Sequence, residues 1–388
     1  MIRDADALST LIADVRAWVR AVAHPNEDRV ADLNEVPADI VSDMAARGYF
    51  GWSIPQEYGG LGLTTEELVM MAFELSQCAV AFRARVGTNT GIGSEALVAD
   101  GTEEQKRRFL PELASGRATG CFALTEPEAG SEATAVTTSA RKDGSDYVLN
   151  GLKCYITNAP IADLFTVIAR TDPDTPGARG LSAFIVERGM KGLRTSDPYT
   201  MMGQAGSPVG EVILEDCRVP AANLIGGQEG QGFRTTMRVL NKQRIHLAAL
   251  CTGPAMRMFD MAFEHAETRR QFGKPIVDFQ LVAALLADCQ TEIHAARALV
   301  QETARARDRG EDIALQASIC KYFASEMCGR VADRAVQVFG GAGFVANHSS
   351  IERYYRDVRL FRLYEGTSQI HQLNITKQTQ RLRAAGAA

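Results

Sequence analysis

Cysteine and histidine are the side chains with which proteins most often hold metals or form redox-active thiol pairs. The chain has eight cysteines and six histidines in 388 residues. No two cysteines form a Cys-x-x-Cys pattern, and no two histidines stand at metal-ligand spacing. We therefore predict no metal site and no disulfide framework, and we expect reduced thiols that pack as small apolar residues. The cysteines stand singly at positions 78, 121, 154, 217, 251, 289, 320 and 328.

Glycine-rich loops can cradle phosphates, but this chain has none of the usual form. No G-x-G-x-x-G follows a predicted strand, and the lysine-bearing P-loop pattern is absent. The glycine cluster GGAG at 340–343 follows a predicted helix, so no helix N-terminus is available there to bind an anion. The sequence thus predicts neither a Rossmann nucleotide site nor a P-loop.

Composition is that of an ordinary globular protein, with 46% hydrophobic residues, 23% charged residues and a net charge of −5. This charge balance argues against nucleic acid, since duplex binding uses clustered cations. The run at 305–312 alternates cations with anions and predicts a solvated face. No apolar run approaches the ~20 residues that cross a bilayer, and Asp4 and Asp6 argue against a signal or transit peptide. We expect a soluble cytoplasmic protein with no membrane partner.

The elements that would position a site fall into three regions, and the first, residues 1–119, is predicted to be helical. Apolar residues recur at three- and four-residue steps from Leu8 to Val22. A second helix is expected to begin with Thr65 as its cap. Thr102 and Gln105 form a capping box for a third helix, which Pro111 is expected to interrupt or end.

The hydrophobic period changes to two in the second region, residues 120–227. Residues 147–153 follow the turn signal Asp143-Gly144 and are predicted to be the return strand of a hairpin. Further strands are predicted at 165–169, 182–186 and 211–214, the last of them ending at the turn before Pro220. Several short strands separated by turns favour a small β-barrel or sandwich.

Helical periodicity returns in the third region, residues 228–388. One apolar stripe runs from Phe279 to Cys289 on a helix that Gly310 closes, and another runs from Ile313 to Ala335. Long amphipathic helices of this kind pack as a bundle. The predicted fold is therefore α+β: an N-terminal helical domain at 1–119, a middle β-barrel domain at 120–227 and a C-terminal four-helix bundle at 228–388.

Several segments, taken together and in order, resemble the signatures of the FAD-dependent acyl-CoA dehydrogenase family. They span all three regions, which makes a chance match improbable. The strongest are CFALTEPEAGS at 121–131, GLKCYITNA at 151–159, RRQFGKPI at 269–276 and YEGTSQI at 364–370, supported by GTEEQ at 101–105, EDCRVP at 215–220 and QVFGG at 337–341.

The resemblance implies that Glu365 is the catalytic base, which removes the α-proton of an acyl thioester while the β-hydrogen leaves as hydride to FAD. A carboxylate in a dry pocket is a stronger base than one in water. Some relatives carry the base on another helix, at the position where this chain has Gln243, whose amide cannot accept a proton. In the family the backbone N–H of the base residue stabilises the enolate oxygen. Without its companion motifs, Glu365 is simply a polar loop residue before a helix.

The resemblance also implies ligand contacts. Tyr155 stands where tryptophan is common, so it offers a smaller aromatic face. The residues implied to bind FAD are Phe122, Leu124, Thr125, Gly130, Ser131, Tyr155, Thr157, Arg269, Phe272, Gln280, Gln337, Gly340, Gly341, Thr367 and Gln369. Those implied to bind substrate are Ser131, Asn241, Arg244 and Gly366.

Two of these residues imply an oligomer. Arg269 and Phe272 match residues that reach the FAD of a neighbouring subunit, where a guanidinium suits a diphosphate. The family forms homotetramers as dimers of dimers and passes electrons to an electron-transfer flavoprotein. A solvated helix end is the alternative interpretation of Arg269.

The acyl group of the substrate is what the sequence defines least. Residues 80–96 are expected to line the acyl cavity, with Gly87, Thr88, Gly91 and Gly93 leaving room. Arg83 and Arg85 could meet a carboxylate on the acyl chain, although a surface or CoA-side position is the favoured interpretation; for Arg244 a surface ion pair is an equal alternative to a CoA contact.

Three functions remain open. The first is dehydrogenation of an acyl-CoA to the trans-2-enoyl-CoA. The second is the same fold acting on a carrier-protein thioester or as an oxygen-using oxidase. The third is a binding or protective protein that lost the reaction, which the intact Glu365 and the mixed surface charge argue against.

Overall fold

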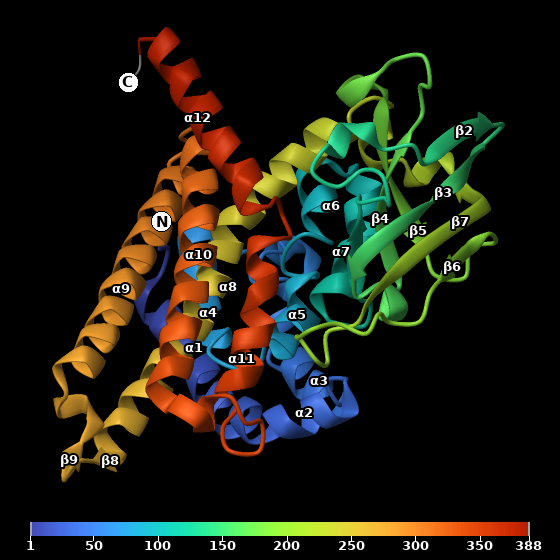
Figure 1. The fold of residues 1–388 in the computed structure, drawn as a ribbon. Helices are drawn as coiled ribbons and strands as arrows, with labels where there is room; N and C mark the ends of the chain where they lie inside the picture. The colour runs from blue at the N-terminus through green and yellow to red at the C-terminus, as the bar shows by residue number, and fades with distance from the viewer. Residues whose placement is uncertain (1, 387–388) are drawn as a thin grey trace.

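The computed structural model describes residues 2–386. Along the chain it has three regions: helices, then a sheet, then helices again (Figure 1). The first helices lie around the base of the later bundle (Figure 1), and α7 shares a hydrophobic core with residues of β4 and β5. Their bounds are Ala5–Trp18 (α1), Glu27–Leu33 (α2), Ala38–Ala46 (α3), Thr65–Leu75 (α4), Val80–Gly87 (α5), Glu95–Asp100 (α6) and Glu103–Ala114 (α7).

Helix α4 begins one residue earlier than its sequence suggested. Thr64, not Thr65, is the N-cap, and it forms a capping box with Glu67. The backbone N–H of Thr65 instead donates to Asp308 Oδ1 at 2.9 Å, and Arg305 Nε donates to Glu66 Oε1 at 2.6 Å. The charged run at 305–312 is therefore not simply a solvated face, since it joins the C-terminal bundle to the start of α4.

Helix α7 has the predicted capping box, with Thr102 and Gln105 bonded reciprocally. Pro111 neither interrupts nor ends it: the helix continues to Ala114, and the carbonyl of Pro111 accepts from Ser115 N–H at 3.1 Å. Proline lacks only the donor of its own position, and the turn after it is intact. Gln105 Nε2 also donates to the carbonyls of Ala222 and Leu224 at 2.7 Å, which fixes α7 against the sheet.

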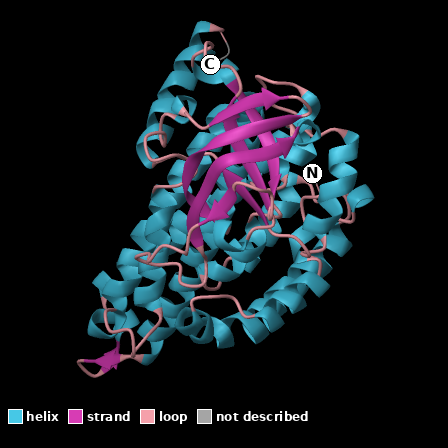
Figure 2. Ribbon diagram, turned by 90° about the vertical axis from the view of Figure 1, so that its right-hand side faces the viewer, coloured by secondary structure: helices cyan, strands magenta, loops and turns pink. Residues whose placement is uncertain are grey.

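The middle of the chain forms one strongly curled, seven-stranded sheet, which is a half-barrel (Figure 2). The order is β1-β4-β2-β3-β7-β6, with β5 antiparallel to β4 and β1 parallel to β4. Strands β1 and β6 were not predicted, and β7 runs through Pro220 instead of ending before it. The bounds are Gly120–Ala123 (β1), Ser139–Asp143 (β2), Asp146–Thr157 (β3), Leu164–Arg170 (β4), Leu181–Glu187 (β5), Leu193–Thr195 (β6) and Val209–Pro220 (β7).

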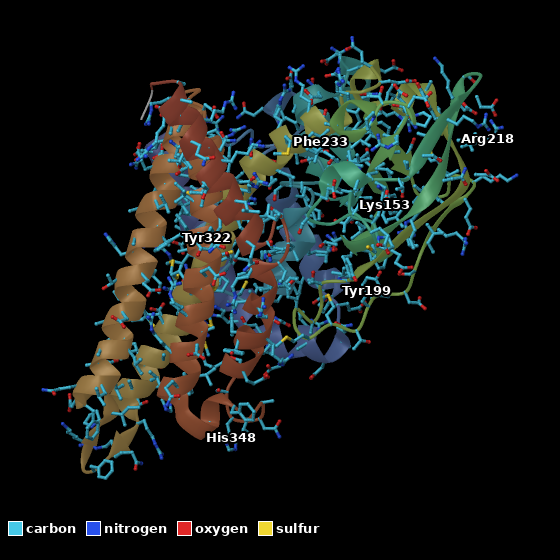
Figure 3. All side chains as sticks on the ribbon, turned by 45° about the horizontal axis from the view of Figure 1, so that its top comes forward. Lys153, Tyr199, Arg218, Phe233, Tyr322 and His348 are labelled. Atoms are coloured by element: carbon cyan, nitrogen blue, oxygen red, sulfur yellow. The ribbon has the colours of Figure 1, made fainter. Side chains whose placement is uncertain are left out.

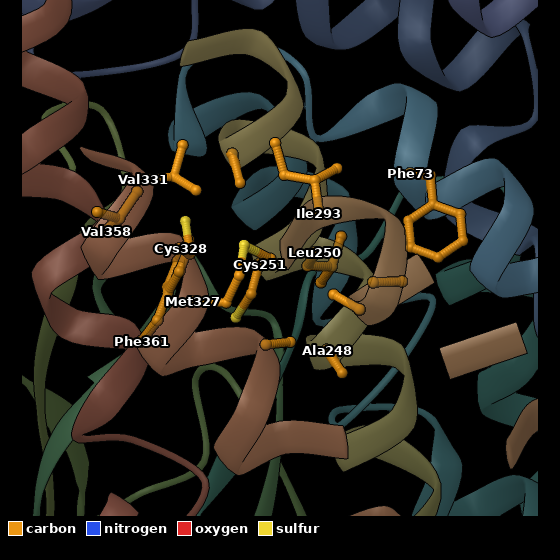
Figure 4. Close-up of a cluster of buried hydrophobic side chains, with 14 of the residues drawn as sticks. Phe73, Ala248, Leu250, Cys251, Ile293, Met327, Cys328, Val331, Val358 and Phe361 are labelled. Atoms are coloured by element: carbon orange, nitrogen blue, oxygen red, sulfur yellow. The ribbon is translucent and has the colours of Figure 1, made fainter. Parts of the chain in front are cut away.

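The C-terminal part is a bundle of long helices that also packs against α4. Its core combines large side chains, such as Phe361 and Met327, with many small ones, such as Ala248, Cys251 and Cys328 (Figure 4). The small residues let the helices approach one another closely. A short hairpin joins α8 to α9. The bounds are Gly232–Thr268 (α8), Arg270–Gln271 (β8), Lys274–Pro275 (β9), Gln280–Asp308 (α9), Ala314–Phe339 (α10), Ile351–Val358 (α11) and Ser368–Ala384 (α12).

All eight cysteines are buried free thiols, as the sequence predicted. Among residues 2–386 no cluster of histidine, cysteine and acidic side chains could hold a metal ion. Within the same residues, no helix combines the length and the apolarity that a membrane span requires.

A buried ion pair ties the segment after β1 to the sheet. Lys153, on β3, is fully buried and donates to Glu126 Oε1 at 2.8 Å and to the carbonyl of Leu124 at 3.1 Å. Glu126 also accepts from the backbone N–H groups of Thr137 and Thr138. Burial acts to raise the pKa of Glu126, but Lys153 and these hydrogen bonds outweigh it and lower the pKa to about 2.

Replacing Glu126 by glutamine should lower the stability of the protein, because Lys153 would remain buried without a counter-ion. Breaking a buried pair in this way costs about 3–5 kcal/mol. The pKa of Glu126 is depressed, so its stabilising contribution is complete above its ordinary value of 4.5 and is lost as the pH falls toward about 2. Thermal unfolding at neutral pH should show a large difference between wild type and variant, and the difference should shrink at acid pH.

The matched control is Glu128→Gln, which removes an exposed carboxylate from the same segment. It should leave the unfolding midpoint nearly unchanged at all pH values. An equal loss in both variants would show that the pair with Lys153 contributes nothing specific.

Candidate active site

A cavity of about 610 Å³ lies where the sheet, α5, α8 and the segment before α12 meet. It gathers residues that are distant in sequence, because β1 and β3 supply one wall, α5 and α8 a second, and the 364–366 segment a third. The predicted site residues on its lining are Phe122, Leu124, Thr125, Gly130, Ser131, Tyr155, Thr157, Arg244, Glu365 and Gly366.

Glu365 is held in an unusual backbone conformation at the edge of this cavity. Its φ of +53° lies in the left-handed region, which non-glycine residues rarely occupy. Its Oε2 atom is buried and has no hydrogen-bond partner within the described chain. Burial raises the pKa of Glu365, and the nearby cations Lys321, Arg83 and Arg244 act in the opposite direction.

Two residues that the sequence did not single out hold the segment of Glu365 in place. Lys321 Nζ, from α10, donates to the carbonyl of Gly366 at 2.6 Å. His371 Nε2 lies 3.2 Å from the carbonyl of Glu365, and burial lowers the pKa of His371 to about 3, so the ring is neutral and Nε2–H is the donor. Lys321 could have been noticed in the sequence, because it is a lysine beside the apolar stripe of a helix predicted to pack in the core.

Arg83 is a buried residue of the cavity, and the surface interpretation of it is wrong. Its side chain is directed inward because α5 is enclosed on nearly all sides. Nη2 donates to the Tyr364 hydroxyl at 2.6 Å. Arg85 has a different environment: Nη1 donates to Thr119 Oγ1 at 3.0 Å, the guanidinium lies over the Phe50 ring, and the residue is not part of the cavity lining.

Arg244 is also buried in the cavity, so a surface ion pair does not describe it. Nη1 donates to Asn241 Oδ1 at 3.0 Å, and Asn241 itself is half-buried behind the lining. Gln243, on the same helix, lines the cavity with an amide nitrogen that has no partner.

The glycines of residues 80–96 do not all leave room for a ligand. Gly87 and Thr88 line the cavity, but Gly91 and Gly93 do not. A Cβ on Gly91 would lie 2.5 Å from Gln243 Oε1, and one on Gly93 would lie 2.9 Å from the carbonyl of Thr88. These two glycines serve close packing between segments.

The sheet-side wall combines an exposed aromatic ring with hydroxyl groups. A bulge in β3 gives Tyr155 a φ of +58° and leaves it 70% exposed, with its ring 5.7 Å from that of Tyr199. Thr125 and Ser131 face the same space from the segment after β1. The buried Lys153 anchors this segment through the carbonyl of Leu124, and Figure 3 labels Lys153 on the sheet. A flat, aromatic ligand with a polar edge fits such a wall: the ring gives it a face to stack on, and the hydroxyls meet its edge.

Two other predicted residues lie close to the cavity without lining it. Thr367 is the N-cap of α12, and its hydroxyl accepts from Ile370 N–H at 3.2 Å. Gln369 is exposed on the first turn of α12.

A second group of predicted residues lies at the opposite end of the bundle. Arg269 follows α8, whose residues from Arg244 onward extend about 38 Å at 1.5 Å per residue. Phe272 is 93% exposed at the tip of the β8–β9 hairpin (Figure 1). Within residues 2–386, Arg269 has no acidic partner within 4.0 Å. The remaining members are exposed as well: Gln280, Gln337, Gly340 and Gly341.

Family models cover nearly all of the chain. The N-terminal, middle and C-terminal domains of acyl-CoA dehydrogenase match residues 6–117, 121–217 and 230–380. A 3-(aryl)acrylate reductase from Clostridium sporogenes is 40% identical over 361 residues, covering 93% of this chain and 95% of that protein. The CarC subunit of the caffeyl-CoA reductase–Etf complex from Acetobacterium woodii is 37% identical over 349 residues, covering 90% and 91%.

A solved structure supports the same family assignment. Butyryl-CoA dehydrogenase from Megasphaera elsdenii superposes with a TM-score of 0.93 at 30% identity, covering 98% of this chain and all of that one. The helix–sheet–helix order, the curled half-barrel and the bundle are those of the predicted fold. The chain therefore belongs to the acyl-CoA dehydrogenase family of FAD-dependent oxidoreductases.

Proposed function

We propose that this protein dehydrogenates the α,β-bond of an acyl-CoA thioester, with Glu365 as the base and FAD as the bound cofactor. The observation that carries the proposal is the state of Glu365: a carboxylate oxygen, buried and without a partner, at the edge of a cavity large enough for an acyl group. Its raised pKa makes it a stronger base than a solvated glutamate.

The backbone at the same residue supports the proposal. Within residues 2–386, the N–H of Glu365 donates to no protein acceptor. A free donor beside the base is suited to the thioester carbonyl oxygen, whose negative charge grows as the α-proton leaves. The strained φ of Glu365 is consistent with a backbone held so that N–H and carboxylate act on one substrate.

The wall formed by β1, its following segment and β3 fits FAD. Phe122, Leu124 and Tyr155 would flank the flavin ring, and Thr125, Ser131 and Thr157 would meet its polar edge, with Gly130 between them. FAD, when bound, accepts the β-hydrogen of the substrate as hydride. Thr367 and Gln369 would contact FAD at the end of this wall. Asn241, Arg244 and Gly366 would contact the substrate.

The relatives bear on the direction of the reaction and on the electron partner. A carboxylate that removes an α-proton also returns it in the reverse reaction, so the site is compatible with the reductases among its relatives. We propose dehydrogenation to the trans-2-enoyl-CoA, with an electron-transfer flavoprotein as acceptor. The relative within an Etf complex supports this choice of partner.

Glu365→Gln should retain bound FAD and the fold but lose thioester-dependent bleaching of the flavin by about three orders of magnitude or more, since the amide cannot accept the proton. The test is anaerobic mixing of the yellow protein with a panel of acyl-CoAs, followed by flavin absorbance. In the wild type the rate should increase with pH as Glu365 ionises, because only the carboxylate acts as base.

Two results would contradict the proposal. Bleaching of Glu365→Gln at the wild-type rate would mean that another base does the work. Absence of bleaching with every acyl-CoA, despite full FAD, would favour a carrier-bound thioester; reoxidation in air as fast as with a one-electron mediator would favour an oxidase.

We further propose that the protein is a homotetramer in which Arg269, Phe272, Gln280, Gln337, Gly340 and Gly341 contact the FAD of a neighbouring subunit. These residues cannot reach the cavity of their own chain, because most of α8 separates them from it. An exposed arginine without an acidic partner is free to bind a diphosphate, and the nearly fully exposed phenylalanine beside it offers apolar surface to a partner.

Arg269→Met should weaken FAD binding about 10- to 100-fold, the effect of losing hydrogen bonds to a charged group. Titration of the apoprotein with FAD measures this, and light scattering reports the size of the assembly. Arg107→Met, which removes an exposed arginine on α7, is the control and should bind FAD normally. Unchanged affinity in Arg269→Met, or a monomer with full FAD affinity, would refute the intersubunit site.

A further inference from the structure

Lys321 is a lysine of α10 whose side chain is fully buried in the core of the bundle. Its ammonium group donates to the carbonyl of Gly366 at 2.6 Å. In the described chain, residues 2–386, it forms no ion pair with a carboxylate within 4.0 Å; Glu326, the first acidic residue after it on α10, lies 3.6 Å from Arg362 instead. Burying a cation is costly, and a paired anion normally offsets the cost. A lysine kept in the core against one backbone carbonyl therefore indicates a role at the segment that carries this carbonyl.

The turn at Glu365 and Gly366 is fixed through its two carbonyl groups. The carbonyl of Glu365 accepts from His371 Nε2 at 3.2 Å, and that of Gly366 accepts from Lys321. Both residues of the turn have a positive φ, +53° and +94°, so the turn needs support from its surroundings. Within residues 2–386 the N–H and the Oε2 atom of Glu365 have no protein partner. The anchors thus hold the backbone while they leave the N–H and the carboxylate free for a substrate.

Two further residues of α10 hold the start of α12. Glu326 Oε1 accepts from Ser368 Oγ at 2.5 Å. The hydroxyl of Tyr322, labelled in Figure 3, accepts from Gln372 Nε2 at 2.9 Å. These two bonds fix residues beyond the turn, whereas Lys321 reaches the turn itself and brings a positive charge to it.

The charge of Lys321 acts on Glu365 as well as on the carbonyl. Burial raises the pKa of Glu365, and the largest opposing effect comes from Lys321, followed by Arg83 and Arg244. The effect is mutual, because burial lowers the pKa of Lys321 and Glu365 acts to raise it. The other titratable groups around the turn are neutral near pH 7 because burial shifts their pKa values; they are Tyr364, Cys251 and His371.

We propose that Lys321 is a positioning residue for the base: its ammonium group holds the Gly366 carbonyl so that the N–H and the carboxylate of Glu365 are both directed at the substrate. The same charge favours the ionised form of the base. Lys321 does not line the cavity, so it acts through Glu365 and Gly366 and not by contact with the substrate. The inference rests on the proposed function, because it explains how the base of that reaction is held.

Lys321→Met keeps most of the apolar stem but removes the charge and the donor. The rate of flavin bleaching at neutral pH should fall about 100-fold, because the turn loses an anchor and more of Glu365 is protonated. The rate should recover in part at higher pH, with the midpoint of the kcat/KM profile about one unit above that of the wild type. KM should change little, since Lys321 is not part of the lining. Anaerobic mixing with butyryl-CoA, octanoyl-CoA and dodecanoyl-CoA over a range of pH measures all three.

A second measurement needs no turnover. Infrared difference spectra of the FAD-loaded protein, recorded over a range of pH, follow the protonated carboxyl band of Glu365, which Glu365→Gln identifies by its loss. The midpoint of this band should lie about one unit higher in Lys321→Met than in the wild type. Lys321→Arg keeps the charge and a donor, so it should return the midpoint close to the wild-type value and restore part of the rate.

Tyr322→Phe is the matched control, because it removes a neutral hydrogen bond between α10 and α12 beyond the turn. It should keep the wild-type rate and both midpoints. FAD content and the unfolding midpoint show whether each variant is folded. If Lys321→Met does not fold, Lys321→Gln, which keeps a donor but no charge, replaces it and should show the same upward shift of the infrared midpoint.

Two outcomes would overturn the inference. An unchanged infrared midpoint in Lys321→Met would show that the charge does not act on the base. A loss of rate that is equal at every pH, and that Lys321→Arg does not restore, would make Lys321 a residue of the core alone. Absence of bleaching with every thioester in the wild type would instead be a failure of the proposed function, and the infrared midpoint would still decide whether Lys321 acts on Glu365.

Discussion

The structure depends on one constraint: a carboxylate must be kept out of water and still be able to ionise. Glu365 meets this constraint at the meeting point of the bundle and the sheet, where burial raises its pKa and three cations oppose the rise. Both effects matter for the proposed role of Glu365, since full desolvation would keep the acid protonated and direct pairing would remove its basicity. The cations act from positions that leave Oε2 unbonded.

The rest of the fold can be understood as support for this arrangement. Lys321 joins two helices of the bundle at the site, because its charged group lies in the core of α10 and donates to the carbonyl of Gly366 just before α12. On the other wall, the ion pair of Lys153 and Glu126 holds the segment after β1 in place in a comparable way. Lys321 is fixed by its hydrogen bond to Gly366, whereas Lys153 and Glu126 are fixed by several hydrogen bonds. Such buried charges make the wall rigid at some cost in desolvation.

The sequence was most informative where local physics decides the outcome. The capping box at Thr102, the Asp143-Gly144 hairpin and the end of α10 at Gly340 follow from side-chain and backbone preferences within a few residues. Strands β1 and β6 were missed because they are short and depend on partners elsewhere in the sheet. Thr64 and not Thr65 is the cap because Glu67 stands three residues after Thr64 and completes a capping box, a local signal that the prediction missed.

The candidate site shows the same limit. Nothing in the immediate sequence of Glu365 distinguishes it from a loop glutamate, and its importance came from motifs spread over the whole chain. Arg83 was misplaced because its environment is made by Phe361 and Tyr364, which are almost the length of the protein away. A helix such as α5, enclosed on nearly every side, has no polar face in its sequence that would tell which arginine points inward.

Arg83 is one of the three cations that act to lower the pKa of Glu365. It is held by the Tyr364 hydroxyl and by the rings of Phe361 and Tyr364, and within residues 2–386 no carboxylate forms an ion pair with it. Because its charge is not cancelled by such a pair, it still acts on Glu365 inside the enclosed cavity. The packing that buries Glu365 and raises its pKa therefore also fixes a cation that opposes the rise.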